Sequence, residues 1–179
     1  MVSTRRLFFA LPLAQELRQQ IIQWRSQQFP ASAGRPVDAE NLHVTLAFLG
    51  EVDANQEQLL REAAGRRRQT AFTLTLNECG HWPRPGVVWL GARQAPQELL
   101  QLAQWLRTQS ARNGCYQSPL PFRPHVSLIR QASGNVQLPS GTPDWRMAVD
   151  RFCLYVSVVE KGFSRYIPLD GWPLTPRSE

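Results

Sequence analysis

Residues 43–46 have the sequence HVTL, and residues 125–128 repeat the pattern as HVSL. Alternate side chains of a β-strand point to opposite faces, so the histidine and the hydroxyl residue of each copy share one face of a strand. An imidazole exchanges protons near neutral pH, and a hydroxyl group beside it can bind a substrate oxygen. One such strand is usually structural, but two matching copies provide an acid, a base and two hydroxyl groups.

The segments before the two motifs also match. Residues 7–11 and 87–90 are short apolar runs, and each is followed by a proline and by apolar residues at helical spacing. The two prolines, at positions 12 and 96, are 84 residues apart (96 − 12), and the two motif histidines are 82 residues apart (125 − 43). This agreement predicts an internal duplication of a strand–helix–strand unit.

Glycine, proline and aspartate residues divide the rest of the chain into further elements. We expect the first motif strand to cover residues 42–49 and to end at Gly50, and we expect Asp53 to cap a helix that runs to about Gly65. Further strands are expected over residues 72–76, 125–129, 146–159 and 166–169, with a hairpin turn at Gly162 between the last two.

Two copies of a strand–helix–strand unit indicate the α+β class. We expect a single bilobal domain over residues 1–179, with two lobes related by a pseudo-twofold axis. Each lobe should have a mostly antiparallel sheet with helices on its outer face. The first motif strand (42–49) and the second motif strand (125–129) would then bring both histidines into one cleft between the lobes.

The composition favours a folded protein with a phosphate-containing partner. Of the 179 residues 42% are hydrophobic and six are tryptophan, which argues against a disordered chain. The formal net charge is +6, and Lys161 is the single lysine among 20 basic residues. Arginine binds phosphate through a planar fork, so this balance suits RNA or a nucleotide, although a genome rich in arginine codons would give the same bias.

The sequence predicts neither secretion nor a membrane span. The three cysteines lack a Cys-x-x-Cys spacing, which favours a reducing cytoplasm, and no apolar run reaches the roughly 18 residues that a bilayer requires. Residues 3–9 (STRRLFF) resemble a twin-arginine export signal, but the apolar run after them is short, so we expect them to form the first strand. We therefore expect a cytoplasmic monomer without a cofactor or an obligate protein partner.

Two histidines in one cleft suit the hydrolysis of a phosphodiester with an internal leaving group. One imidazole would take a proton from the attacking water, and the other would give a proton to the departing oxygen. Thr45 and Ser127, on the same strand faces as the histidines, would donate hydrogen bonds to the nonbridging phosphate oxygens. This chemistry requires no metal ion.

Several residues around the motifs resemble those of the two-histidine phosphoesterases. They are the paired motif itself, Arg123 and Pro124 before the second histidine, Arg130 after it, and the sequence LAFLG at residues 46–50. The similarity extends over essentially the whole chain. Each four-residue motif is weak by itself, but the pair at this spacing is fairly specific.

The resemblance implies a bilobal enzyme that hydrolyses the terminal 2′,3′-cyclic phosphate of RNA to a 2′-phosphate. It also implies a slow, reversible joining of RNA ends through 2′-5′ linkages without ATP. His43 would be the proton donor and His125 the proton acceptor. The substrates would be RNA ends, including tRNA halves, or cyclic nucleotides. Ser127 stands where the family often has threonine, so the hydroxyl group is kept.

Strict alternation of side chains along each motif strand predicts which face the neighbouring residues occupy. Arg130 is a candidate phosphate clamp, but counting from His125 places it on the opposite strand face unless the strand ends or bulges. Arg123 is a second candidate, separated from His125 by a proline. By the same counting Phe48 is expected in the core. His81 has no counterpart in the second half and is expected to be a loop or structural residue.

Three alternatives stay open. A non-enzymatic RNA-binding module would also explain the arginine excess, and its binding would survive the loss of both histidines. A metallohydrolase would use the histidines as ligands, but the sequence has no His-x-His, no His-Glu-x-x-His and no acidic cluster at ligand spacing. A phosphodiesterase for another cyclic or 2′-5′-linked nucleotide would use the same two proton transfers.

Overall fold

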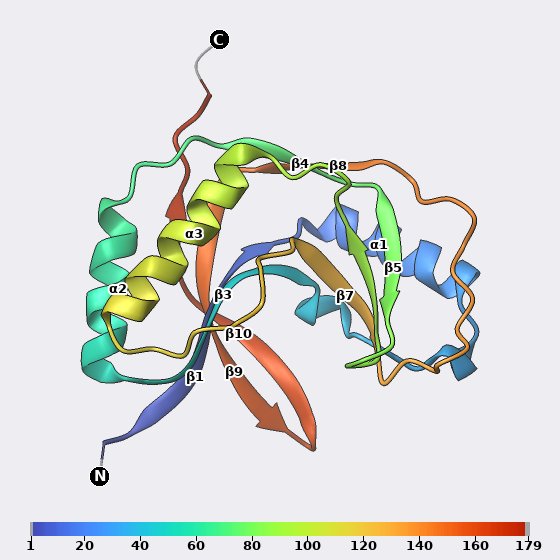
Figure 1. Ribbon diagram of the computed structural model, residues 1–179, viewed down its shortest axis with the longest axis horizontal. Helices are drawn as coiled ribbons and strands as arrows, with labels where there is room; N and C mark the ends of the chain where they lie inside the picture. The colour runs from blue at the N-terminus through green and yellow to red at the C-terminus, as the bar shows by residue number, and fades with distance from the viewer. Residues whose placement is uncertain (1, 178–179) are drawn as a thin grey trace.

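The computed structural model describes residues 2–177 as a mixed α+β fold, drawn in Figure 1. Its helices are α1 (Gln15–Gln28), α2 (Ala54–Arg66) and α3 (Gln97–Arg112), and short 3₁₀ turns cover Ala31–Ala33 and Ala39–Asn41. Its strands are β1 (Thr4–Pro12), β2 (Arg35–Pro36), β3 (His43–Asp53), β4 (Phe72–Leu76), β5 (Glu78–Trp82), β6 (Val87–Gly91), β7 (His125–Arg130), β8 (Trp145–Val149), β9 (Arg151–Glu160) and β10 (Phe163–Pro173). No helix within this range is long and apolar enough to cross a bilayer.

Most of the strands belong to one large sheet, in the order β10-β9-β1-β3-β7-β6-β5, with β2 beside β7. All neighbouring strands in it are antiparallel. The hairpin turn predicted between β9 and β10 is confirmed at Gly162, which has a positive φ of 80°. β4 and β8 form a separate two-stranded sheet. The α+β class and the antiparallel sheets predicted from the sequence are therefore confirmed.

The two halves of the large sheet meet at a narrow junction. β3 of the first half and β7 of the second half pair through Val44 and Val126. The β9–β10 hairpin extends the sheet beyond β1, and β5 extends it beyond β6. This continuous sheet with a narrow centre is compatible with the expected two lobes, which stay a prediction.

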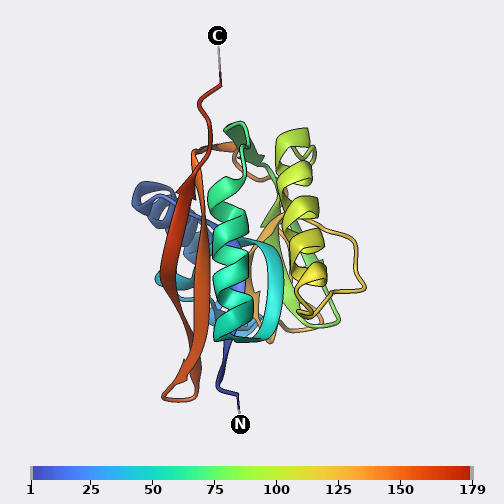
Figure 2. The same ribbon diagram turned by 90° about the vertical axis from the view of Figure 1, so that its left-hand side faces the viewer.

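A strand–helix–strand unit occurs in each half, as β1-α1-β3 and as β6-α3-β7. The helices begin at residues 15 and 97 and the motif strands at residues 43 and 125, so both offsets are 82 residues (97 − 15 and 125 − 43). Each helix reaches the other half: α3 contacts β3, and Arg25 of α1 donates a hydrogen bond to the Leu128 carbonyl of β7. Figures 1 and 2 show α2 and α3 side by side, with α1 apart from them. This arrangement is compatible with an internal duplication, which stays a prediction.

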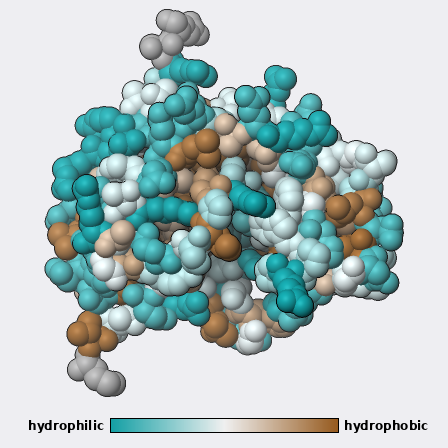
Figure 3. Space-filling view, in the orientation of Figure 1, coloured by the Kyte–Doolittle hydropathy of each residue, from teal (hydrophilic) through white to brown (hydrophobic). Residues whose placement is uncertain are grey.

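Local sequence signals explain how the helices form and pack. The residues whose spacing predicted α3 are all buried: Leu99, Leu102, Ala103 and Leu106. Burial of each leucine side chain stabilises the fold by roughly 1.5–3 kcal/mol. Asp53 caps α2 as predicted, because its carboxylate accepts a hydrogen bond from the Gln56 backbone while the Gln56 side chain accepts one from the Asp53 backbone. On the face drawn in Figure 3, hydrophilic residues cover most of the periphery and apolar residues reach the surface near the centre.

The structure corrects three expectations about the elements. β3 continues past Gly50 to Asp53, because Gly50 adopts a positive φ of 71° at a register shift and the strand then resumes its pairing with β1. The apolar run 146–159 forms two strands, since β8 pairs with β4 and β9 pairs with β1. Of the two alternatives for His81, the loop position is wrong because the residue lies on β5, and the structural role stays a prediction; its Nε2 atom is buried without a hydrogen-bond partner among residues 2–177.

Candidate active site

The two motif strands lie next to each other and run in opposite directions. Val44 and Val126 are paired and fully buried. Extending this antiparallel register by one residue places each histidine across from the hydroxyl residue of the other motif: His43 across from Ser127, and His125 across from Thr45. These four side chains are half-buried and point away from the two valines, so the motifs form one polar cluster.

A β-bulge occurs at the same place in both motif strands. The pairing of β1 with β3 skips Leu46, and the pairing of β6 with β7 skips Leu128. In each strand the skipped leucine and the residue after it are both buried. The alternation of side chains therefore shifts by one position after each motif.

Phe48 and Arg130 occupy equivalent positions after these bulges, and both lie on the face of the polar cluster. The expectation that Phe48 is a core residue is wrong, because its side chain is 38% exposed and lines a cavity together with Thr45 and His125. Arg130 was expected to reach the site only if its strand ended or bulged, and the bulge is present. Its side chain is exposed and lies close enough to both imidazoles for its charge to act on them. The bulge at Leu128 thus brings the predicted arginine to the site.

The same backbone contact orients each histidine. Nδ1 of His43 lies 2.6 Å from the carbonyl oxygen of Asn41, and Nδ1 of His125 lies 2.7 Å from the carbonyl oxygen of Arg123. A carbonyl oxygen only accepts, so Nδ1 carries a proton in both rings and the neutral form has an unprotonated Nε2. At His43 this Nε2 accepts a hydrogen bond of 2.7 Å from the Thr45 hydroxyl.

Burial favours the neutral form of both imidazoles. Desolvation lowers the pKa of His43 to about 4, the Asn41 carbonyl partly opposes this change, and the positive charges of Arg130 and His125 lower the pKa further. Desolvation also lowers the pKa of His125. The hydrogen bond to the Arg123 carbonyl partly opposes this change, and the positive charge of Arg130 lowers the pKa further. The ligand-free cluster thus combines two neutral imidazoles with a cationic arginine, which suits an anionic ligand.

The stability of the protein should depend on pH through His43. The pKa of this group is about 4 in the folded chain and near 6.5 in the unfolded chain, so the unfolded chain binds the proton more tightly. We expect the free energy of unfolding to fall as the pH drops from about 6.5 towards about 4, and the His43→Asn variant to lose part of this dependence. Urea unfolding at a series of pH values measures it. An unchanged pH dependence in the variant would contradict the depressed pKa.

Aromatic rings enclose the two histidines. The ring centroids of Phe8 and Tyr166 lie 5.0 and 5.1 Å from that of His43, and the Trp82 ring packs edge-to-face against His125 at 4.7 Å. None of these three residues was expected from the sequence to be part of the site. No local signal marks them, because the order of the strands in the sheet brings them to the histidines.

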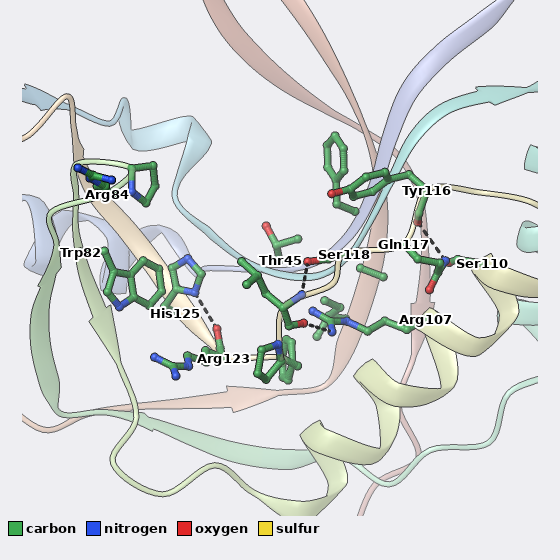
Figure 4. Close-up of a pocket in the computed structure, with 17 residues that line it drawn as sticks. Thr45, Trp82, Arg84, Arg107, Ser110, Tyr116, Gln117, Ser118, Arg123 and His125 are labelled. Carbon is green, nitrogen blue, oxygen red and sulfur yellow. Dashed lines mark hydrogen bonds between the residues drawn. The ribbon is translucent and has the colours of Figure 1, made fainter.

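A cavity of about 440 Å³ lies beside His125 and Thr45. Aromatic residues form much of its wall: Phe48, Trp82, Tyr116 and Phe122. Figure 4 shows the His125 ring next to Trp82, with Thr45 facing the same space. Arg123 lines this cavity as well, so both arginines predicted from the sequence lie near the histidines.

Comparison with known proteins agrees with this geometry. Residues 11–89 match the family model described as LigT like Phosphoesterase. The chain is 54% identical over 175 residues to the RNA 2′,3′-cyclic phosphodiesterase of Escherichia coli (strain K12), and the alignment covers 98% of this chain and 99% of that protein. The chain belongs to the LigT-like phosphoesterase family.

Two solved structures of similar proteins have the same fold. The crystal structure of E. coli LigT complexed with 3′-AMP matches with a TM-score of 0.93 at 54% sequence identity, over 96% of this chain and 99% of that chain. The crystal structure of the Thermus thermophilus protein TT0787 matches with a TM-score of 0.76 at 26% identity, over 94% of this chain and 97% of that chain. The resemblance found in the motifs is therefore confirmed as membership of the LigT-like family.

Proposed function

We propose that the protein hydrolyses the terminal 2′,3′-cyclic phosphate of RNA to a 2′-phosphate. Its relatives in E. coli and Thermus thermophilus are both named RNA 2′,3′-cyclic phosphodiesterase. The observation that carries the proposal is the position of His43 and His125 on one face of adjacent strands, each with its Nδ1 bound to a backbone carbonyl. Two imidazoles oriented in this way can act on opposite sides of one phosphorus atom.

The reaction requires two proton transfers. His125 takes a proton from water through Nε2 while the water oxygen attacks phosphorus. The bond between phosphorus and O3′ breaks, and His43 gives a proton to O3′, which leaves a 3′-hydroxyl and a 2′-phosphate. Thr45 and Ser127 donate hydrogen bonds to the nonbridging oxygens, and Arg130 supplies a positive charge to them.

As the donor, His43 must be protonated when the substrate is bound. Desolvation lowers the pKa of His43 to about 4 in the ligand-free protein, so the ring is neutral near pH 7. A bound phosphate next to the ring favours the charged form and should raise this pKa. Nitrogen-detected NMR titrations with and without inorganic phosphate measure the change. A pKa of His43 that stays the same at saturating phosphate would contradict the donor role.

The proposed function is tested with an RNA that ends in a 2′,3′-cyclic phosphate, incubated with the protein in EDTA. We expect hydrolysis, with a 2′-phosphate as the product, identified by phosphorus NMR. Within residues 2–177 no three His, Cys, Asp or Glu side chains form a group that could hold a metal ion, and the EDTA arm tests the prediction of a metal-independent reaction. Loss of activity in EDTA would support the metallohydrolase instead, and a 3′-phosphate product would contradict the proposed leaving oxygen.

The finer proposals concern the substrate and the direction of the reaction. When a 5′-hydroxyl takes the place of water, the same two proton transfers form a 2′-5′ linkage without ATP, so the joining of RNA ends is a related activity of the site. RNA ends, including tRNA halves, and cyclic nucleotides are the proposed substrates of a cytoplasmic monomer. RNA binding without any hydrolysis would favour the binding module.

A further inference from the structure

A second, smaller cavity of about 190 Å³ is lined by two residues that contact His43. Its wall includes Asn41, whose carbonyl oxygen accepts the hydrogen bond from His43 Nδ1, and Tyr166, whose ring packs edge-on against the His43 ring. Arg35 of β2 and Arg130 of β7 line the same cavity. It shares no lining residue with the 440 Å³ cavity beside His125, so the two cavities are distinct.

Two arginines face each other in the smaller cavity, and within residues 2–177 the acidic residue on its wall, Asp38, forms an ion pair with neither of them. Arg35 and Arg130 are direct partners in the pairing of β2 with β7, and like charges directly opposite in a sheet are destabilising. Within residues 2–177 neither guanidinium lies within 4.0 Å of a carboxylate. An anion bound between them would relieve this repulsion.

An aromatic ring holds Arg35 in place. Its guanidinium lies 3.8 Å from the ring centroid of Phe163, at the start of β10. The planar fork of an arginine that is already positioned loses little freedom when it binds a phosphate. The position of Arg35 therefore favours phosphate binding even before a ligand arrives.

The acidic residue on the cavity wall interacts with a different arginine. Burial lowers the pKa of Arg25, and the nearby Asp38 carboxylate partly offsets this effect. Arg25 donates hydrogen bonds to the carbonyl oxygens of Val37 and Leu128 and thereby supports the bulge that directs Arg130 to the site. The single carboxylate of Asp38 thus lies among three arginines, Arg25, Arg35 and Arg130, and the cavity keeps a net positive charge.

We propose that Arg35 binds a second phosphate of the substrate in the smaller cavity, the internal phosphodiester on the 5′ side of the terminal nucleotide, while Arg130 stays with the cyclic phosphate at the histidines. This inference rests on the proposed function, because it assigns the cyclic phosphate to the two histidines. The equivalent positions after the bulges distinguish the two cavities. Phe48 lines the larger one, which has an aromatic wall as well as three arginines (Arg84, Arg107 and Arg123), and Arg130 lines the smaller one. An aromatic wall suits a nucleobase, and a guanidinium group that is held in place suits a phosphate.

A comparison of two substrates tests the second phosphate site. One is a nucleoside 2′,3′-cyclic phosphate, and the other is a dinucleotide with the same terminal nucleotide, which adds one internal phosphate. We expect Arg35→Gln to lower kcat/KM for the dinucleotide about tenfold or more, because a charge-assisted hydrogen bond is lost, and to change kcat/KM for the mononucleotide less than about twofold. The slope of log kcat/KM against log salt should fall by about 1 for the dinucleotide alone.

Two further variants serve as controls. Arg93→Gln removes the same charge from an exposed position that lines neither cavity, and it should leave both substrates unaffected. Phe163→Leu keeps Arg35 but removes the ring beneath it, and it should cause a smaller loss for the dinucleotide alone.

The outcomes separate this inference from the proposed function. Hydrolysis of the mononucleoside cyclic phosphate by the wild-type protein tests the proposed function by itself. Equal losses of Arg35→Gln on both substrates would place Arg35 at the scissile phosphate and overturn the second site. Unchanged activity of Arg35→Gln on both substrates would also overturn it.

Discussion

Replacing either motif histidine by alanine is expected to lower kcat/KM for an RNA 2′,3′-cyclic phosphate by about 10²–10⁴-fold. Each imidazole makes one proton transfer, and the hydroxyl groups of Thr45 and Ser127 do not titrate near neutral pH and cannot replace it. Because both transfers belong to one reaction, the double variant should be little worse than either single variant. Single-turnover rates for the three variants measure this non-additivity.

His81→Ala is a matched control for the two motif variants. His81 is also a histidine on a strand of the large sheet, but it lines neither of the two cavities at the polar cluster. Its replacement should leave kcat/KM within a few-fold of the wild-type value. If His43→Ala or His125→Ala were no less active than His81→Ala, the paired-histidine mechanism would be wrong.

Gly80→Ala is expected to lower the free energy of unfolding by about 1–3 kcal/mol, the usual cost of overpacking, and to reduce activity as well. The Trp89 ring lies so close to Gly80 that an added Cβ would overlap it. Trp82 packs against Trp89 with ring centroids 5.2 Å apart, and it also packs edge-to-face against His125. The added methyl group must therefore displace the cluster of rings that supports His125.

Gly141→Ala is the control for this variant. A Cβ at Gly141 would meet no atom within 4 Å, and its φ is not positive, so its replacement should change the free energy of unfolding by no more than about 0.5 kcal/mol. Urea unfolding and kcat/KM of both variants measure the difference. Equal behaviour of the two variants would contradict the packing of Trp89 on Gly80.

Elements with a local cause could be predicted from the sequence. The apolar spacing of Leu99, Leu102 and Leu106 predicts α3, and Asp53 with Gln56 predicts the start of α2. The two motifs predict a pair of strands with their histidines on a common face, because alternation within a four-residue strand segment depends on the backbone alone.

Features that depend on pairing between distant strands could not be predicted. Leu46 and Leu128 look like ordinary strand residues, and their bulges exist because β3 and β7 pair with β1 and β6 in a shifted register. Strict alternation therefore placed Phe48 in the core, which is wrong, and it could not decide which face of the strand Arg130 occupies. The division of residues 146–159 into two strands also depends on partners, β4 and β1, that lie far away in the sequence.

The different residues after the two bulges bear on which histidine takes which role. A site with perfect twofold symmetry would accept a cyclic phosphate in two equivalent poses, and either histidine could then lie next to O3′. Phe48 on one side and Arg130 on the other make these poses unequal in energy. The separate donor and acceptor roles therefore follow from the divergence of two otherwise matching strands.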